Sequence, residues 1–419
     1  MKHMKKITAL VLALLLLIGL TGCQKAPAGN TVTIEGEWVW ADRYDGAFSA
    51  DGYYFLKNFS FLSYLDTASC VSTVLCTKVG CLHDQAQSNS QQEACEAYMS
   101  NLNFSSGGSC FWDGSLYYID QSNLGVNLYR CNAIGTDRKM IGKLATAYIE
   151  NQQTVSLSRF ARVENYWYYY ATVNGTVYDE ESETWENKQL LNYIGRIDLR
   201  TGKEELVVED SENTLTLCAA QENAVLYTTR GIPEADLRDP AYREQLRKLP
   251  VTLYYRNVES KEPVKVFEKD GSNFGQINLV VGEKLYYGLS EQKEDGGYTG
   301  SYYVYDLKTG SDTLFAENEA MQYLGGEYVK RMELGTEEWY IFGLESGKQM
   351  PINVSSGYPR MECWSDQGCA MFWQVQLESG EKENRWCYVT YEAMADGLQD
   401  EDMLILYSRI NGEGVLEEN

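Results

Sequence analysis

The chain has 419 residues, of which 44% are hydrophobic and 23% are charged, a balance typical of a folded globular protein. Tyrosine is abundant at 32 residues and glycine at 36, whereas proline numbers only 7. Acidic residues outnumber basic ones 60 to 36, which gives a formal net charge of −24. We therefore expect no nucleic-acid partner, because phosphate binding needs a concentrated basic surface.

The N-terminus has the features of an export signal. Three lysines within the first six residues precede an uncharged apolar run, 7–20, that is too short to span a bilayer as a helix. The run ends in Leu20-Thr21-Gly22-Cys23, which resembles the lipobox of bacterial lipoproteins. The resemblance implies cleavage before Cys23 and lipid attachment to its sulfur and its new amino terminus. An ordinary secretory signal or an uncleaved anchor is the alternative.

This signal predicts the domain organisation and the location of the protein. We expect a signal peptide over 1–22, a lipidated Cys23 with a flexible linker over 23–36, and one folded domain over 37–419. The lipid on Cys23 would hold a monomeric protein at the extracytoplasmic face of the cell membrane.

Two short units recur along the folded part of the chain. The first is a polar turn followed by an aromatic strand, as in Asp113-Gly114-Ser115-Leu116-Tyr117-Tyr118. The second is a strand that runs into a polar turn, as in Tyr305-Asp306-Leu307-Lys308-Thr309-Gly310. Seven copies of the first unit begin at Asp51, Asp113, Glu164, Glu222, Gly282, Gly325 and Asp366. Seven copies of the second begin at Tyr64, Arg130, Arg196, Arg256, Tyr305, Phe342 and Ser408.

The paired repeat predicts an all-β, seven-bladed β-propeller. Aromatic and β-branched residues suit strands that are packed on both faces, and the turn sequences suit tight antiparallel connections. A ring of such sheets buries the faces that one sheet alone would expose. A two-domain β-sandwich is the alternative, but it does not predict a repeat continuing from residue 50 to 412. We expect the first unit to begin a middle strand of each blade.

The blade pattern resembles the propellers of the TolB-like and YWTD-like kind. The strand followed by Asp-x-x-Thr-Gly, as at Asp198 and Asp306, carries this resemblance, although no blade has an intact Tyr-Trp-Thr-Asp. The whole chain is similar to propeller lipoproteins of gut-dwelling Gram-positive bacteria. The resemblance implies the fold and the location of the protein, and it implies no activity.

Three segments interrupt the repeat. In 230–250, Asp239 and Pro240 form a good helix start, and the apolar residues that follow fall on one helical stripe. We expect an amphipathic helix over 240–249, and we expect helix to be confined to this segment and the signal. We interpret 374–384 and 393–401 as loop excursions of the last blade.

Ten cysteines remain beside Cys23, and five of them are crowded between 70 and 110. We expect a disulfide among Cys76, Cys81 and Cys95, most simply Cys81–Cys95 or Cys76–Cys95, because it would fix a long connection after the first blade. The alternatives are free buried thiols and a zinc site formed by Cys76, Cys81, His83 and Cys95, although the gaps between these ligands are irregular. Cys218, Cys363, Cys369 and Cys387 lie in or beside predicted strands, where we expect small core residues, with a Cys363–Cys369 or Cys369–Cys387 bridge as the alternative.

The sequence gives no catalytic residue to name. His83 is the one histidine beyond the signal, so a serine or cysteine triad and a three-histidine zinc site are not expected. Phosphate-loop, dinucleotide and calcium-loop motifs are missing, and we expect no cofactor. Carboxylate chemistry of the glycosidase kind stays open, because 60 acids offer too many pairs to choose from.

We therefore interpret the chain as a membrane-anchored binding or scaffold module that uses one propeller face for a protein or glycan ligand. A carbohydrate-active enzyme and a sensor or assembly partner of a membrane complex are the alternatives. Aromatic side chains near turns or strand ends would supply stacking surfaces, although packing between blades is the more common reason for any one such residue. The tryptophans concerned are Trp38, Trp40, Trp112, Trp185, Trp364 and Trp373.

Overall fold

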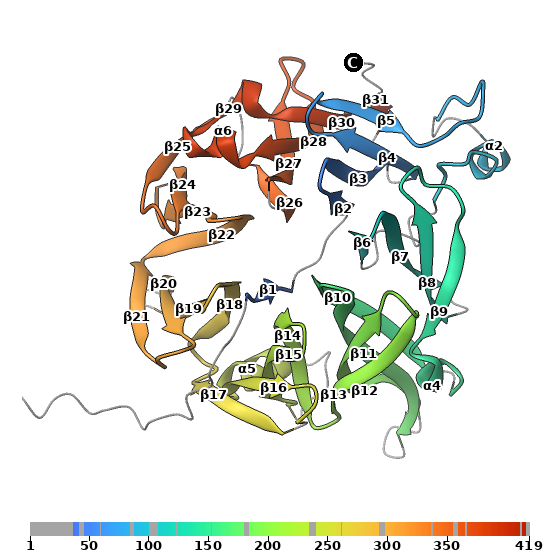
Figure 1. Ribbon diagram of the computed structural model, residues 1–419. Helices are drawn as coiled ribbons and strands as arrows, with labels where there is room; N and C mark the ends of the chain where they lie inside the picture. Colours follow the sequence, from blue (N-terminus) through green and yellow to red (C-terminus); the bar gives the residue numbers. More distant parts are fainter. Residues whose placement is uncertain are drawn as a thin grey trace, which may run out of the picture.

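Seven antiparallel sheets surround a central axis, as the repeat predicts (Figure 1). The computed structural model describes residues 37–41, 46–58, 60–83, 88–99, 108–122, 125–151, 153–179, 184–233, 240–260, 262–292, 298–336, 338–354, 359–364, 367–410 and 413–415. The expected signal peptide and Cys23 lie outside these residues. In the described part of the chain, no helix is long and apolar enough to cross a bilayer.

The first three blades each contain four strands that follow one another in the sequence, the first nearest the axis (Figure 1). Blade 1 contains β2 (Gly46–Ser49), β3 (Gly52–Lys57), β4 (Phe61–Asp66) and β5 (Val71–Val74). Blade 2 contains β6 (Ser109–Trp112), β7 (Ser115–Ser122), β8 (Gly125–Asn132) and β9 (Lys139–Leu144). Blade 3 contains β10 (Thr154–Val163), β11 (Tyr166–Asp179), β12 (Thr184–Asp198) and β13 (Lys203–Asp210).

The other four blades repeat this order, and three of them gain a further short strand. Blade 4 contains β14 (Asn213–Gln221), β15 (Ala224–Gly231), β16 (Val251–Asn257) and β17 (Pro263–Lys269), and β1 (Val39–Trp40) joins it. Blade 5 contains β18 (Phe274–Val281), β19 (Lys284–Gln292), β20 (Tyr298–Asp306) and β21 (Asp312–Glu317). Blade 6 contains β22 (Glu319–Gly325), β23 (Tyr328–Glu333), β24 (Trp339–Gly343) and β25 (Gln349–Asn353), and β29 (Leu398–Gln399) joins it. Blade 7 contains β26 (Arg360–Trp364), β27 (Gly368–Gln376), β28 (Lys382–Thr390), β30 (Leu404–Ile410) and β31 (Glu413–Val415).

The turn-plus-aromatic units have the role expected of them. Each leads into the second strand of a blade, namely β3, β7, β11, β15, β19, β23 and β27. In the turn before β7, Asp113 and Gly114 have φ values of 45° and 69°, as a two-residue type I′ hairpin requires. The aromatic residues that follow are buried on both faces of the strand, as in Tyr53, Tyr54 and Phe55 of β3. The repeat therefore encodes both the hairpin and the packing between blades.

The ring closes by side-chain packing between blades 1 and 7, each of which takes its four main strands from one continuous part of the chain. Phe55 of blade 1 stacks on Tyr407 of blade 7 with ring centroids 6.2 Å apart and an interplanar angle of 5°. Gln367 Nε2 also donates to the Ala50 carbonyl at 2.9 Å. Aromatic packing thus holds blades 1 and 7 together at this seam, in place of a strand shared between them.

The first described residues lie at the centre of the ring. β1 pairs antiparallel with β14, the innermost strand of blade 4, with Trp40 opposite Ala219 (Figure 1). The next residue continues the contact, because the Ala41 N–H donates to the Cys218 carbonyl at 2.8 Å. Trp38, Trp40 and Ala41 are buried. The N-terminal segment therefore joins the propeller at its axis and not at its rim.

Helices are few, but there are more than we expected. The predicted helix is present as α5 (Pro240–Lys248), between β15 and β16. The expectation that helix would be confined to the signal and to this segment was wrong, because two connections between blades and one connection within blade 7 form further short helical turns. These are α2 (Asn89–Glu93), α4 (Thr146–Ile149), α6 (Tyr391–Ala395) and the 3₁₀ turn η1 (Asp400–Asp402).

The two loop excursions expected in the last blade differ from each other. Most of 374–384 belongs to the hairpin of β27 and β28, so this is a regular blade element and not an excursion. By contrast, 393–401 does leave blade 7, since it contains the end of α6 and the strand β29, which pairs in parallel with β25 of blade 6. The sequence of 374–384 does not distinguish a strand from a polar loop, because the strands of this hairpin are rich in charged residues.

Candidate functional site

The connections of the propeller divide between its two faces. In an antiparallel sheet of consecutive strands, the first and third turns lie at one end, and the second turn and the link to the next blade lie at the other. The short repeated turns therefore share one face, here called the turn face. Most of the longer and more varied segments share the opposite face, here called the connection face, whereas 391–403 of blade 7 lies on the turn face. Those on the connection face include the link from β5 to β6, α4, the end of the β11–β12 hairpin and α5.

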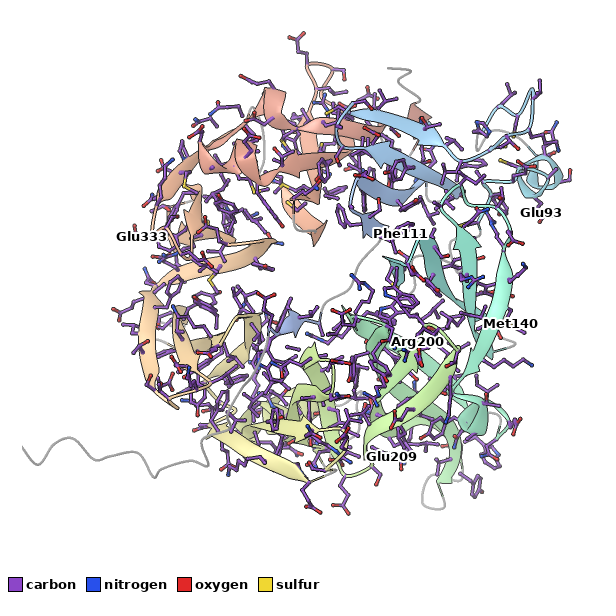
Figure 2. The ribbon with its side chains drawn as sticks, in the orientation of Figure 1. Glu93, Phe111, Met140, Arg200, Glu209 and Glu333 are labelled. Atoms are coloured by element: carbon purple, nitrogen blue, oxygen red, sulfur yellow. The ribbon has the colours of Figure 1, made fainter. Side chains whose placement is uncertain are left out.

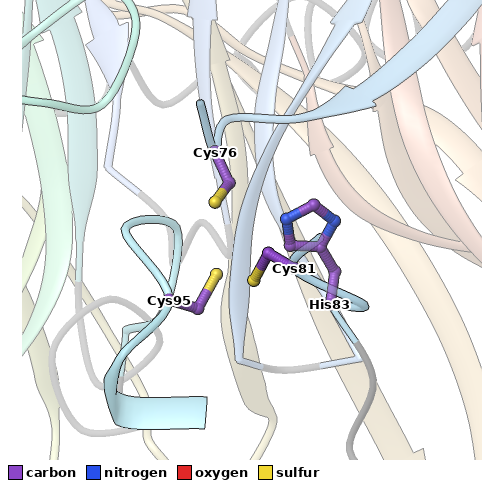
Figure 3. Close-up of side chains that lie close together, drawn as sticks. All are labelled: Cys76, Cys81, His83 and Cys95. Atoms are coloured by element: carbon purple, nitrogen blue, oxygen red, sulfur yellow. The ribbon is translucent and has the colours of Figure 1, made fainter. Parts of the chain in front are cut away.

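Four of the expected site residues come together in the link from β5 to β6. The side chains of Cys76, Cys81, His83 and Cys95, here called the thiol cluster, place their ligand atoms within 4.8 Å of one another. Figure 3 shows the three sulfurs turned toward one another with the His83 ring beside them. The cluster lies outside β5 near α2, at the outer edge of the ring, where Figure 2 places Glu93.

Backbone turns fold this link back on itself. The Cys81 N–H donates to the Lys78 carbonyl at 3.4 Å, and Gly80 between them has a φ of 77°. A side chain at Gly80 would be strained at this φ, so glycine suits the turn. His83 itself has a φ of 52°, a left-handed conformation that is uncommon for residues other than glycine. These two positions bring Cys76, Cys81 and His83 to the same side.

Cys95, the fourth member of the cluster, lies just after α2 in the second half of the link. Cys95 precedes Ala97, whose carbonyl accepts a hydrogen bond from the Leu62 N–H at 2.8 Å, and Tyr98 forms an isolated bridge with Phe61. Phe61, Cys95 and Ala97 are buried together in a small core of their own. The beginning of β4 is thus the support on which the cluster rests.

A second support comes from blade 2. The Arg138 guanidinium donates to the carbonyls of Tyr98 at 2.8 Å, Glu96 at 2.7 Å and Gly135 at 3.0 Å. Glu96 in turn accepts from the N–H and hydroxyl of Thr77, at 3.0 and 2.6 Å. The two ends of the link are therefore held to each other and to the neighbouring blade.

The surroundings of the thiols separate their pKa values. Burial alone would raise the pKa of Cys76, but the His83 side chain, the backbone N–H groups of Lys78 and Glu96 and the Cys95 thiol together lower it to about 6. Burial and the neighbouring thiols of Cys81 and Cys76 raise the pKa of Cys95 to about 12. The cluster therefore stabilises Cys76 as a thiolate at neutral pH, and the negative charge of this thiolate helps to raise the pKa of Cys95.

The other cysteines are distributed through the structure. Cys70 is exposed, while Cys110, Cys131, Cys218, Cys369 and Cys387 are buried. None of these described thiols, including those of the cluster, is joined in a disulfide in the structure. Cys218, Cys369 and Cys387 are the core residues that we expected, whereas the side chain of Cys363 lies outside the described residues. The disulfide expected among Cys76, Cys81 and Cys95 stays a prediction.

A second candidate surface lies on blade 3. β11 and β12 remain paired with each other beyond the ends of β10 and β13, as far as Asp179 opposite Thr184. This two-stranded extension, here called the blade 3 ribbon, carries Tyr178 opposite Trp185 with ring centroids 5.2 Å apart. Tyr178 is 46% exposed and Trp185 is 70% exposed. We named Trp185 from its position near a turn, but the sequence did not indicate the ribbon, because an acidic stretch beside it is typical of a solvated loop.

The remaining tryptophans have different surroundings. Trp38, Trp40 and Trp373 are buried, so blade packing explains them. Trp112 is half-buried and packs against the core of blades 2 and 3. The side chain of Trp364 lies outside the described residues. Of the six tryptophans considered for ligand stacking, Trp185 is thus the one that the structure shows exposed.

Comparison with known proteins assigns no family to this chain. No protein-family model matches the sequence, and no curated protein is detectably similar to it. Among solved structures, an oligogalacturonate lyase in complex with manganese covers 80% of this chain and 87% of its own, at 13% identity and a TM-score of 0.47. The β-propeller domain of the Trilobed protease from Pyrococcus furiosus covers 83% and 93%, at 11% identity and a TM-score of 0.42. TolB from Acinetobacter baumannii covers 83% and 76%, at 10% identity and a TM-score of 0.35. Likenesses at this level carry no argument about this chain, and no activity is transferred from them.

Proposed function

We propose that this protein is a lipid-anchored extracytoplasmic binding module that engages its ligand through the connection face. The anchor is supported by the basic residues, apolar run and Leu20-Thr21-Gly22-Cys23 at the N-terminus. The structure describes the chain from residue 37, where it enters the centre of the ring beside β14. A tether of 14 residues, Cys23 to Gly36, would then link the lipid to the axis of the propeller.

The observation that carries the binding role is the exposed aromatic pair of the blade 3 ribbon. A Tyr–Trp pair on a two-stranded projection gains nothing from the blade core, so its apolar area is available to a ligand. Aromatic faces of this kind stack on sugar rings or on apolar peptide side chains. The acidic sequence around the ribbon, from Asp179 to Glu186, disfavours an anionic ligand.

The anchor is tested by Cys23→Ala in the producing cell, with Cys70→Ala as the matched control because Cys70 is exposed and outside the signal. The Cys23 variant should lose fatty-acid labelling and move to the soluble exported fraction, whereas the Cys70 variant should stay in the membrane. Retention of the Cys23 variant after a salt wash would show that the apolar run is an uncleaved anchor.

The binding surface is tested by titrating the protein with oligosaccharide and peptide panels. Trp185→Ala should weaken the strongest interaction found by about tenfold, since stacking of this kind contributes on the order of 1.4 kcal/mol. Leu206→Ala is the control, because Leu206 is an exposed apolar residue of the same blade, on β13. An equal loss of affinity in both variants, or no loss in either, would exclude the ribbon from the binding surface.

A further inference from the structure

We propose that Cys76, Cys81, His83 and Cys95 bind one zinc ion as a structural site with four protein ligands. This inference concerns the thiol cluster and does not depend on the proposed binding role. Thiolate and imidazole are ligands that zinc prefers, and three sulfurs with one nitrogen form a known structural ligand set. A site with four protein ligands has no position left for substrate, which favours a structural over a catalytic role.

The first support is distance. A tetrahedral zinc ion with usual bond lengths holds its ligand atoms about 3.5–3.8 Å apart. In the cluster all four ligand atoms already lie within 4.8 Å of one another. Closing by about 1 Å at the widest pair would complete the tetrahedron. Movements of this size need rotation of side chains and no rearrangement of the two turns that position them.

The second support is an unsatisfied atom. His83 Nε2 is buried, and within the described part of the chain no donor or acceptor forms a hydrogen bond with it. The Phe61 ring lies edge-on to the imidazole, with centroids 6.3 Å apart, and cannot replace a polar partner. Leaving such a nitrogen without a partner is unfavourable, because burial removes its hydration. A metal ion in the cluster would satisfy it directly.

The third support is the backbone around the sulfurs. The N–H of Lys78, two residues after Cys76, interacts with the Cys76 sulfur, as does the N–H of Glu96. The N–H of Ala97, two residues after Cys95, interacts with the Cys95 sulfur. Donors aimed at coordinating sulfurs stabilise thiolates and orient them toward a metal. A disulfide carries no thiolate charge and would use little of this arrangement.

A disulfide also leaves part of the cluster unexplained. It would use two of the three sulfurs and would leave the third thiol and the His83 nitrogen without a role. Zinc uses all four groups, and its binding requires no oxidant. The zinc–sulfur and zinc–nitrogen bonds form as the remaining thiol protons pass to solvent, with no change in oxidation state. The site would fix both ends of the link between β5 and β6 on the edge of blade 1.

The test measures metal content in the full-length protein extracted from membranes with detergent and without chelator. We expect about one zinc ion per chain by elemental mass spectrometry. Cys81→Ser and His83→Gln should each lose most of it, and Cys70→Ser should retain it. Because Cys70 is an exposed thiol of the same blade, this control separates coordination from a general effect of losing a cysteine.

A second measurement protects the test against variants that fail to fold. Wild-type protein is stripped with a chelator and reloaded with cobalt, which should produce the absorption bands of a tetrahedral cobalt–thiolate site. Three results would overturn the proposal. These are wild-type protein without zinc or cobalt binding, zinc retained at full stoichiometry in both ligand variants, and a mass gain of two hydrogens on reduction that maps to a disulfide within 76–95.

Discussion

The cysteines inside the blades and the cysteines of the thiol cluster show how surroundings decide what the same side chain can do. The blade thiols are buried in the cores of the propeller, as Cys110 is in the core between blades 2 and 3. Burial raises the pKa to about 12 for Cys110 and Cys387 and to about 11 for Cys131 and Cys218. These thiols behave as small apolar residues, and their chemistry is suppressed.

The thiol cluster has the opposite character. Its sulfurs face one another and an imidazole, and backbone N–H groups are directed at two of them. The difference follows from the backbone, because strands in a blade use their N–H groups in the ladder, whereas the link from β5 to β6 has N–H groups free to interact with sulfur. We therefore expect reactive or metal-binding thiols in the connections outside the sheets and not within the blades.

The sharpest way to break this comparison is alkylation followed by peptide mass spectrometry. In folded, zinc-loaded protein the exposed Cys70 should be modified, while the thiol cluster and the blade thiols are protected. After chelation Cys76, Cys81 and Cys95 should become fully modified, because the metal no longer occupies the thiolates. The blade thiols should react only after denaturation. Cluster thiols that react as fast as Cys70 before chelation would contradict the zinc assignment.

The propeller could be predicted from sequence because its information is local and repeated. Each turn and the aromatic strand after it can be recognised within about ten residues, and seven copies reinforce one another. β1 could not be predicted in this way, because Val39 and Trp40 are too short a strand to show a period. Their partners, Ala220 and Ala219, lie about 180 residues away. α4 has four residues and shows no side-chain cap hydrogen bond, so it lacks the usual sequence signal of a helix start.

The thiol cluster illustrates a different limit. Its residues could be named from sequence, but the gaps between them do not match the short ligand spacings of familiar zinc sites. The structure brings them together by means that spacing does not encode. Gly80 and His83 adopt positive φ values, and residues 97–99 pair with the start of β4. Proximity here is a tertiary property, and the sequence alone favoured a disulfide, with a zinc site as an alternative.

A pH titration of unfolding tests the other side of the comparison, the buried thiols of the blades. The pKa of Cys387 is raised to about 12 in the folded protein, mainly by burial, so the unfolded chain ionises first as pH rises. Between the pKa of the thiol in the unfolded chain, about 8.5, and its pKa in the folded protein, Cys387 lowers the free energy of unfolding as pH rises. The decrease is up to about 1.4 kcal/mol per pH unit. Cys387→Ala should remove this contribution, so its free energy of unfolding should fall less steeply than that of wild type from pH 9 to 11.

The comparison with Cys387→Ala is internal, since the other titrating groups are common to both proteins. Their contributions cancel when the slopes of the two curves are subtracted. The substitution also leaves a small cavity, which shifts the whole curve but not its slope. Parallel curves for the two proteins over this pH range would show that Cys387 ionises in the folded state and is not isolated in the core.

The smallest expected effect concerns the contact between the thiol cluster and blade 2. Arg138→Ala removes the donors to the carbonyls of Glu96 and Tyr98, so the end of the link should open more often. We expect a local loss of about 1 kcal/mol, seen as roughly fivefold faster hydrogen exchange in 93–99, with blades 4–7 unchanged. Arg200→Ala is the control, because Arg200 is exposed and pairs with Asp198 two residues away. If the cluster were held by its own ligands alone, both variants would exchange alike, and blade 2 would have no part in positioning Cys95.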